Sequence, residues 1–582
     1  MPKTNAVGTA AILAAIVLAG MLAGVWVIAR ETAPRFEVEL TTDAGRAIAA
    51  LGREVPVTGR VFVVLTRDGA REPREQVGVT GVPFFALDVR DLAPGLPVVL
   101  SDETPGLAGY PLARIADLPP GEYYVQAFLN VYTTYHRADG RTLELHHETG
   151  EGQDPWRSPG NAYSAVQRVR LDPRRGRIVT LQLSRVIPPI EPVPEGGVLD
   201  QGNPQDGELV KFIKIRSPRV SEFWGRDMYI GANVLLPRDY HANPDTRYPV
   251  IYLQGHFPGR RAPFGFSEAD DAPPRARAFR DFWLSSRAPR VIAVTIRDAN
   301  PYYDTSYSVN SANVGPYGDA IVEELIPELE RRFRIIAEPW ARVLAGGSTG
   351  GWEALALQVF YPDVFGGAWG WCPDPVDFRD YQLVNIYEDA NAYHAGHEWL
   401  RVERPSRREV DGNVDYTIED ENAFERAVGP NGRSGGQWAI WEAVFGPVGP
   451  DGYPAPIWDP VTGEIDRETA AFWREHYDLT DYLRRNWKQL GPKLTGKLHV
   501  TVGDMDDYYL NEAVYRMQAA LDSLSDPPAR ASFEYGRRKG HCWIGYSRER
   551  PGEDLDYAEF VRIAADHIAR NAPPGADLRW AR

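Results

Sequence analysis

The hexapeptide Gly346-Gly347-Ser348-Thr349-Gly350-Gly351 decides the fold that we predict from the sequence. A short apolar run, Val343-Leu344-Ala345, comes directly before it, and a helix-like segment, Trp352 to Phe360, follows it. A strand, a tight glycine turn and a helix form the context in which the pattern Gly-x-Ser-x-Gly exposes a serine hydroxyl above a sheet. The stretch therefore predicts an α/β sheet with Ser348 as a nucleophile.

A glycine-rich turn at the start of a helix can also bind phosphate. The lysine of a P-loop is absent from this turn, and the glycine spacing of a dinucleotide-binding turn occurs neither here nor after a first strand. We therefore interpret the turn as a nucleophile site, and we predict no cofactor.

A serine hydroxyl is a weak nucleophile at neutral pH, so it needs a base that an acid holds in one tautomer. In this type of sheet the three residues follow in the chain order Ser, acid, His. The strand-like run 498–502 ends in Gly503-Asp504-Met505-Asp506-Asp507, and the run 532–536 is followed by Gly540-His541. We predict His541 as the base and Asp506 as the residue that orients it. The aspartates that stay open as alternatives to Asp506 are Asp504, Asp507, Asp374 and Asp377.

Acyl transfer also needs two backbone N–H donors for the oxyanion, and the loss of one costs about 10²–10³-fold in rate. The first donor is predicted to be the amide of Thr349, directly after the nucleophile. The second is predicted in the loop after the apolar run 250–253, at Phe257 with His256 as the alternative.

Two continuous apolar runs, 250–253 and 291–296, precede the serine turn. Such runs are typical of strands buried on both faces, as in parallel sheets covered by helices. We therefore predict a mostly parallel, doubly wound α/β domain over 208–582. The connection between Trp371 and Lys497 is far longer than a usual loop. We predict a large tryptophan-rich insertion at about 373–495 that adds a cap or wall around the site.

The segment 35–185 contains short β-branched and aromatic runs between Pro and Gly turns, which predicts an all-β, sandwich-like domain. The Pro/Gly-rich stretch 186–207 is predicted to be a linker. Residues 6–29 form an uncharged apolar run that is long enough for a membrane-spanning helix. We therefore predict a signal peptide or membrane anchor at 1–34, and export of the rest to the periplasm or the extracellular space.

The chain carries a formal net charge of −16 without a long basic run, which argues against nucleic acid as a partner. Its two cysteines, Cys372 and Cys542, lack the paired spacing of a zinc site. The segment His394-x-x-His397-Glu398 lacks a third ligand, so no metal is predicted. Both cysteines are expected near the active-site face, and a disulfide between them is our hypothesis for an exported protein.

The chain resembles the putative-esterase family, which includes enterochelin esterases, S-formylglutathione hydrolases, feruloyl esterases and mycolyltransferases. The stretches that carry the resemblance are Tyr248 to Leu253, Tyr317-Gly318-Asp319, Glu324 to Pro327, Gly346 to Gly351, Gly503-x-x-Asp506 and Gly540-His541. The resemblance covers about 208–570 and implies an α/β-hydrolase fold without a metal. It also implies Ser348, Asp506 and His541 at the triad positions. Gly255-His256 departs from the pattern, since many members have His-Gly there.

Together these features predict an exported serine esterase that forms an acyl-enzyme on a small-molecule or polymer-linked carboxylic ester. An acyltransferase with the same three residues stays open, because no residue identifies the acceptor. A non-catalytic protein that binds glycan or the cell envelope on a hydrolase scaffold stays open as well. Contact with a membrane is predicted only through residues 6–29. No oligomeric state is predicted.

Overall fold

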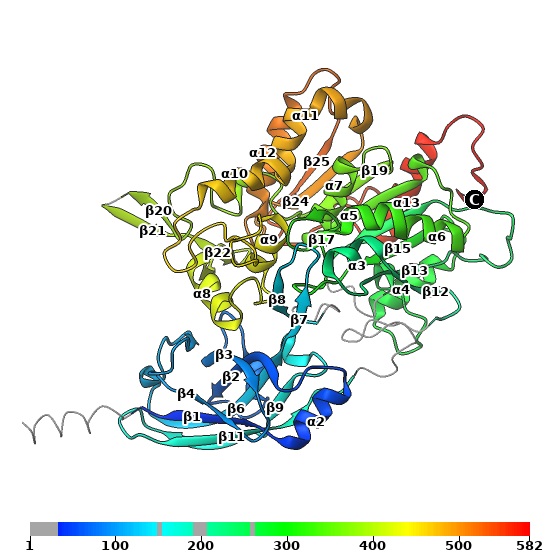
Figure 1. Cartoon of the computed structure of the whole chain (residues 1–582). Coiled ribbons are helices and arrows are strands. Elements are labelled where there is room, and N and C mark those ends of the chain that lie inside the picture. The colour runs from blue at the N-terminus through cyan, green and yellow to red at the C-terminus, as the bar shows by residue number, and fades with distance from the viewer. Residues whose placement is uncertain (1–32, 148–153, 190–205, 257–261, 398, 582) are drawn as a thin grey trace, which may run out of the picture. The chain divides into compact units, whose positions relative to one another are not determined.

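The computed structural model describes residues 33–147, 154–189, 206–256, 262–397 and 399–581 (Figure 1). The chain divides into two compact units, the first made of 1–130 and 162–186 and the second of 131–161 and 187–582. The apolar run 6–29 and most of the predicted linker lie outside the described residues. Within the described ranges, no helix combines the length and the apolar character needed to cross a membrane.

The first unit is built on a nine-stranded sheet with the pairing order β4-β1-β11-β9-β6-β2-β3-β5, to which β10 adds by pairing with β6. Its strands are β1 (Arg35–Leu40), β2 (Val57–Thr66), β3 (Phe84–Leu92), β4 (Pro97–Leu100), β5 (Ala108–Tyr110), β6 (Gly121–Val131), β9 (Ala162–Ser164), β10 (Gln167–Leu171) and β11 (Ile178–Val186). One helix, α2 (Thr42–Ala50), follows β1. All nine strands belong to one hydrogen-bonded sheet, so the two separate sheets of a sandwich are not confirmed.

The alternation of side chains explains how this sheet forms its core. In β11, Val179, Leu181 and Leu183 are buried while the residues between them are exposed, which is the pattern of a strand with one solvated face. β2 is buried along almost its whole length. The ring centroids of Phe62 and Phe128 lie 6.0 Å apart in the interior. Over its described residues, from Ala33 on, the first unit is thus an all-β body with a single α-helix.

A hairpin within the predicted β-domain belongs instead to the second unit. It consists of β7 (Thr133–His136) and β8 (Thr142–Leu145). The Tyr135 ring packs edge-on against Trp224 at 5.2 Å, and His146 Nε2 lies 2.8 Å from the carbonyl oxygen of Arg433. The predicted continuous domain over 35–185 is therefore wrong for residues 131–161. Strand signals show that a hairpin forms, but they do not show which core buries it.

The second unit contains an eight-stranded mixed sheet with the order β12-β13-β15-β14-β18-β19-β24-β25. Its strands are β12 (Val210–Arg216), β13 (Tyr229–Leu235), β14 (Val250–Gln254), β15 (Ile292–Arg297), β18 (Arg342–Gly347), β19 (Gly367–Trp371), β24 (Leu498–Gly503) and β25 (Ser532–Gly536). The pairs β12/β13 and β13/β15 are antiparallel, and every later pair is parallel. The predicted α/β architecture is confirmed. The carboxyl ends of the parallel strands meet at one edge, where ligand-facing residues gather.

Helices cover this sheet. They are α3 (Pro218–Trp224), α4 (Pro274–Trp283), α5 (Tyr317–Ala320), α6 (Ile326–Arg332), α7 (Thr349–Phe360), α12 (Leu510–Asp522) and α13 (Tyr557–Asn571). Helices α5 and α6 are joined by a π-helical turn, Ile321–Leu325. Pro327 lacks an N–H and cannot continue the regular hydrogen-bond ladder, which accounts for the local irregularity.

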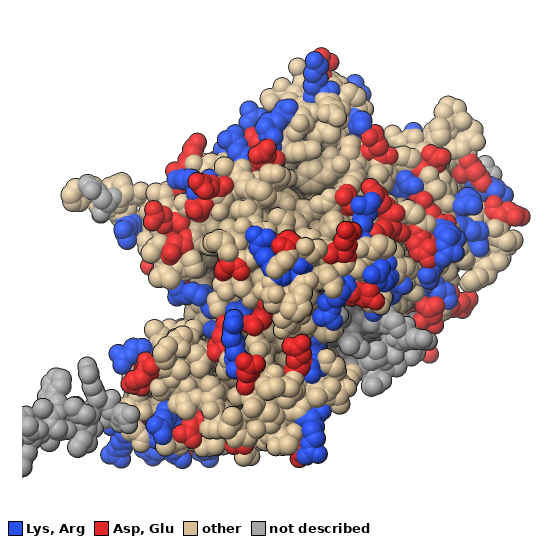
Figure 2. Space-filling view, viewed as in Figure 1, with Lys and Arg blue, Asp and Glu red and all other residues tan. Residues whose placement is uncertain are grey.

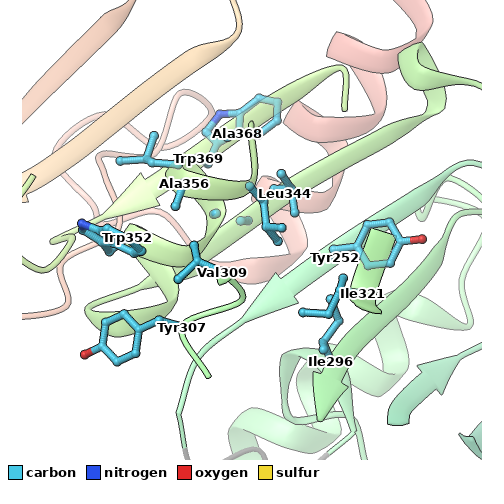
Figure 3. Packing of buried hydrophobic residues seen from close by; sticks show 14 of the residues in the cluster. Tyr252, Ile296, Tyr307, Val309, Ile321, Leu344, Trp352, Ala356, Ala368 and Trp369 are labelled. Carbon is cyan, nitrogen blue, oxygen red and sulfur yellow. The ribbon is translucent and has the colours of Figure 1, made fainter. Parts of the chain in front are cut away.

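Helix α7 carries the residues that follow Ser348 and is buried from Thr349 to Val359. It packs on β14, β18 and β19, and Figure 3 shows Ala356 and Trp352 of this helix with Leu344 of β18. A fully buried aliphatic side chain such as Leu344 contributes about 1.5–3 kcal/mol to stability. The serine turn is therefore fixed at both ends by rigid, buried elements.

The predicted insertion contains helices α8 (Ile418–Val428), α9 (Gln437–Phe445), α10 (Arg467–His476) and α11 (Leu479–Leu494). It also contains two hairpins, β20 (His394–His397) with β21 (Leu400–Glu403), and β22 (Pro405–Arg408) with β23 (Val414–Thr417). The Tyr381 ring lies 5.0–5.8 Å from the rings of Trp438, Trp441, Trp458 and Trp473. Most tryptophans of the insertion thus build its own core.

Charged side chains of both signs are interspersed on the face shown in Figure 2, without a large region of Lys and Arg alone. Mixed charge of this kind gives a solvated surface. Proteins that bind phosphate backbones instead gather Lys and Arg on one face or stripe.

Candidate active site

Ser348 lies at the sharp turn between β18 and α7. Its backbone has φ 57° and ψ −124°, a conformation that costs a non-glycine residue about 1–3 kcal/mol. The Ser348 N–H donates to the Trp371 carbonyl at 3.0 Å, which fixes the turn to β19. A Cβ at Gly346 would lie 2.2 Å from the Gly350 oxygen, and a Cβ at Gly350 would lie 2.1 Å from the Gln254 oxygen. Both glycines are thus required by close backbone approach.

Gly350→Ala is expected to destabilise the second unit by about 1–3 kcal/mol, because its methyl group would overlap a backbone oxygen that cannot rotate away. Gly347→Ala is the matched control, since a Cβ there would meet nothing closer than 3.9 Å. Thermal unfolding followed by circular dichroism compares the two variants. Equal midpoints would contradict the close packing described for Gly350.

The structure brings three of the predicted residues into one hydrogen-bonded chain. Ser348 Oγ lies 3.0 Å from His541 Nε2, and His541 Nδ1 lies 2.8 Å from Asp506 Oδ2. Ser348 follows β18, Asp506 follows β24, and His541 lies in the loop after β25. All three sit at the carboxyl ends of parallel strands, as the sequence order predicts.

Asp506 is fully buried, and its second carboxylate oxygen accepts the backbone N–H groups of Tyr508 at 3.0 Å and Leu510 at 3.3 Å. These bonds hold the carboxylate toward the imidazole. The alternative Asp507 accepts the backbone N–H of His541 at 2.9 Å, and Asp504 accepts that of Arg538 at 2.6 Å. Both alternatives therefore shape the histidine loop without contacting the ring nitrogens.

The other two alternatives follow β19. Asp377 pairs with Arg379, with its Oδ1 2.8 Å from the guanidinium Nε. Asp374, in contrast, reaches the nucleophile, since Ser348 Oγ lies 3.4 Å from its Oδ1. Its position just past a strand end was a signal for this site, although its contact with the serine was not predicted.

Asp374 is buried and accepts hydrogen bonds from Tyr307 OH at 2.7 Å, Thr349 Oγ1 at 3.0 Å and Trp441 Nε1 at 3.2 Å. Burial raises the pKa of this carboxyl, while the hydrogen bonds lower it in part. The network ties the nucleophile turn to α9 of the insertion. Tyr307 also contacts Trp352 edge-on, and both rings are visible in Figure 3.

A second contact from the insertion supports the acid loop. Arg408, at the end of β22, donates from Nε to the Asp506 carbonyl at 3.0 Å, and its own N–H donates to the Asp507 carbonyl at 2.9 Å. Its guanidinium lies 4.1 Å from the centre of the Tyr509 ring. No sequence motif distinguishes Arg408 from other arginines, so only the fold reveals this role.

The electrostatics around His541 involve several groups. Burial lowers the pKa of its imidazole, but the Asp506 carboxylate and the Cys542 thiol raise it, and the net pKa lies well above the usual value. A hydrogen bond with Cys372 lowers the pKa of Cys542 to about 5, against the opposing effect of burial. Burial, with the charge of His541, lowers the pKa of His256 to about 4.

A cavity of about 670 Å³ opens onto Ser348 and His541. The insertion lines part of it with Gln382, Glu421, Gln437 and Trp441, and so forms one of its walls. The other side chains include Trp371, Asp374, Tyr508, Leu510, Ile544 and Tyr557. Among the described lining residues there is no lysine or arginine. The cavity is therefore aromatic and acidic, with amide groups.

The predicted oxyanion donors are placed only in part. Thr349 is the first residue of α7, where a backbone N–H has no partner within the helix and is available to a ligand. Gly255 and His256 line the cavity, whereas Phe257 lies outside the described residues. The amide of Thr349 thus has a suitable position, and the second donor stays a prediction.

The two cysteines lie close to each other and to His541. Cys372 follows β19 and is buried, while Cys542 is exposed, and both are free thiols in the structure. A Cβ at Gly347 would lie 3.9 Å from Cys542 Sγ and 4.0 Å from Cys372 Sγ. The expected proximity is present, and the disulfide itself stays a hypothesis.

Part of the chain is similar to known esterases. Residues 221–424 match the family model described as "Putative esterase", a range that contains Ser348. An "Endo-1,4-beta-xylanase/feruloyl esterase" of Xylanibacter ruminicola is 27% identical over 147 residues, which are 24% of this chain and 19% of that protein. "Esterase Rv1288" of Mycobacterium tuberculosis is 32% identical over 156 residues, 26% of this chain and 31% of that protein. The matches thus span less than a third of these relatives.

Solved structures with some similarity include a ferulic acid esterase, at 14% identity and a TM-score of 0.34, which covers 62% of this chain and 99% of that one. An S-formylglutathione hydrolase from Agrobacterium tumefaciens is 11% identical, with a TM-score of 0.31, and covers 63% of this chain and 96% of that one. The resemblance that the sequence motifs indicate is confirmed by the family model, and residues 221–424 of the second unit are similar to the putative-esterase family.

Proposed function

We propose that the protein hydrolyses carboxylic esters through an acyl-enzyme on Ser348. The observation that carries this proposal is the hydrogen-bonded chain Ser348–His541–Asp506, with its serine at a strained turn that opens onto a cavity. Nucleophile, base and orienting acid in contact are the arrangement that activates a serine hydroxyl. The similarity to esterases over 221–424 supports the same reaction class.

In this mechanism Ser348 Oγ attacks the ester carbonyl carbon while its proton passes to His541 Nε2. Asp506 accepts the N–H of His541 Nδ1, which keeps Nε2 free to act as base and stabilises the imidazolium that forms. The imidazolium then protonates the leaving alcohol. Water, deprotonated by the same nitrogen, releases the acid and restores the serine. The amide of Thr349 would stabilise the oxyanion in both steps.

We also propose that the reaction takes place outside the cytoplasm, on a small-molecule or polymer-linked ester. The apolar run 6–29 supports export, either through cleavage or as an anchor. The cavity wall formed by the insertion supports a substrate with aromatic or hydrogen-bonding groups.

A fluorophosphonate probe tests the mechanism directly. The purified chain without residues 1–34 should be labelled once, and peptide mapping should place the label on Ser348. Hydrolysis of p-nitrophenyl acetate should fall in proportion to labelling. A label on another residue would refute the acyl-enzyme proposal. Failure of the probe to label protein that is intact and folded would refute it as well.

A further inference from the structure

We propose that Cys372, His541 and Cys542 form a binding site for one thiophilic divalent cation such as Zn²⁺. The two sulfur atoms and a ring nitrogen of His541 all lie within 4.8 Å of one another. Three ligand atoms of this kind, from two cysteines and a histidine, match the preference of zinc for sulfur and nitrogen. The effect of the ion on catalysis, described below, rests on the proposed esterase function, whereas the binding itself does not.

The backbone directs both sulfur atoms to the same space. Cys372 has φ 38° and Cys542 has φ 60°, so each occupies a left-handed conformation that is unfavourable for a side chain other than glycine or asparagine. Strain of this kind persists where the surroundings fix it and gathers at functional sites. Gly347 supplies the room, because even an added Cβ would stay 3.9 Å from the nearer sulfur.

The distances suit a metal after a small adjustment. In a tetrahedral zinc site with bonds of about 2.3 Å to sulfur, neighbouring ligand atoms lie about 3.8 Å apart. The three ligand atoms here are at most 4.8 Å apart, so movements of about 1 Å or less complete the geometry. The two cysteines and the histidine leave a fourth position for water, as in open zinc sites.

The Asp506 carboxylate already fixes the orientation of the His541 ring. His541 Nδ1 lies 2.8 Å from Asp506 Oδ2. Because this hydrogen bond occupies Nδ1, we assign the metal–nitrogen bond to Nε2. A carboxylate that accepts the other N–H of a histidine ligand is the usual outer partner in zinc sites, and it fixes the ring orientation. The same hydrogen bond that orients a base therefore also orients a ligand.

Charge and access favour a cation. The buried carboxylates of Asp506 and Asp374 lie on either side of the nucleophile–base pair, and no described lining residue is a lysine or arginine. Cys542 lies on the cavity wall, so an ion can reach the site from the substrate side. Binding forms two metal–sulfur bonds and one metal–nitrogen bond and releases two protons to water, so that both cysteines bind as thiolates and His541 binds as a neutral imidazole.

An ion held by His541 Nε2 occupies the lone pair that would accept the serine proton. Ser348 Oγ, 3.0 Å from that nitrogen, loses its base while the ion stays bound. The site would therefore act as a reversible inhibitory site, and loss of the metal would restore the activity.

Cobalt(II) is the probe that tests binding without any enzymatic readout. The metal-free chain without residues 1–34, kept reduced with a phosphine, should bind one Co²⁺ and show a thiolate-to-cobalt charge-transfer band. Cys372→Ser and Cys542→Ser should each lose the band and weaken binding by more than the roughly 10–100-fold that loss of an outer partner costs. Ser348→Ala, which removes no ligand, should keep it.

Inhibition by Zn²⁺ of p-nitrophenyl acetate hydrolysis, measured relative to each variant's own activity, tests the consequence. The wild type should be inhibited by Zn²⁺ and should recover its activity with EDTA, whereas Mg²⁺ should have no effect. Cys372→Ser and Cys542→Ser should both resist inhibition by Zn²⁺. Absence of the cobalt band, its survival in both cysteine variants, or thiols that stay bridged under the phosphine would overturn the site. A cobalt band in a protein without esterase activity would uphold the site and refute the proposed function alone.

Discussion

Ser348→Ala is expected to reduce the turnover of p-nitrophenyl esters by about 10⁴–10⁶-fold, to the level that binding and oxyanion stabilisation alone provide. The reason is that Ser348 Oγ, 3.0 Å from His541 Nε2, is the hydroxyl that the base can deprotonate. The measurement is kcat/KM for the variant and the wild type, prepared in parallel.

Ser523→Ala is the matched control, because this exposed hydroxyl bonds only the carbonyl of Ala520 at the end of α12. Its kcat/KM should equal that of the wild type. If Ser348→Ala retained activity within tenfold of the wild type, another nucleophile would carry the reaction, and the assignment of the turn would be wrong.

Asp506→Asn is expected to lower kcat/KM by about 10⁴-fold at neutral pH, since an amide no longer holds the imidazole in the productive tautomer. It should also change the pH profile. The wild-type activity is complete above the pKa of His541 and is lost as the pH falls through it, because a protonated imidazole cannot accept the serine proton. Asp506 raises that pKa. The acid limb of the residual activity should therefore move to lower pH in Asp506→Asn.

Asp504→Asn provides the comparison, since Asp504 bonds the Arg538 N–H and does not contact the imidazole. It should change kcat/KM by less than tenfold and leave the acid limb in place. A large loss of kcat/KM in Asp504→Asn together with a small loss in Asp506→Asn would show that Asp504 orients the histidine.

The sequence predicted Ser348, His541 and Asp506 because each follows a strand, and the carboxyl ends of parallel strands meet at one edge of the sheet. It could not choose Asp506 over Asp507 by pattern alone, as adjacent residues share the same local signals. The choice depends on the turn before α12, where the Tyr508 and Leu510 amides hold the Asp506 carboxylate.

Other features depend on contacts between distant segments. The Asp374 network needs Trp441 of α9, and the acid loop needs Arg408 of β22, both from the insertion. Likewise, the cysteines lack any ligand spacing because they follow two separate strands, β19 and β25. Hydrophobic periodicity reports local structure and burial, but not which strands pair, so the single sheet of the first unit was not predicted either.

The β7–β8 hairpin has a consequence for the order of synthesis. Tyr135, Leu143 and Leu145 are part of the buried cluster of the second unit, although they leave the ribosome before nearly all of its other members. The Tyr135 ring packs only once Trp224 has been synthesised, and His146, next to the hairpin, reaches the Arg433 carbonyl later still. A nascent chain cut short before those residues would keep this hairpin without its core. A separately produced 208–582 segment would lack it altogether. Because residues 131–161 of the second unit lie between the two segments of the first, no single cut in the chain separates one complete unit from the other.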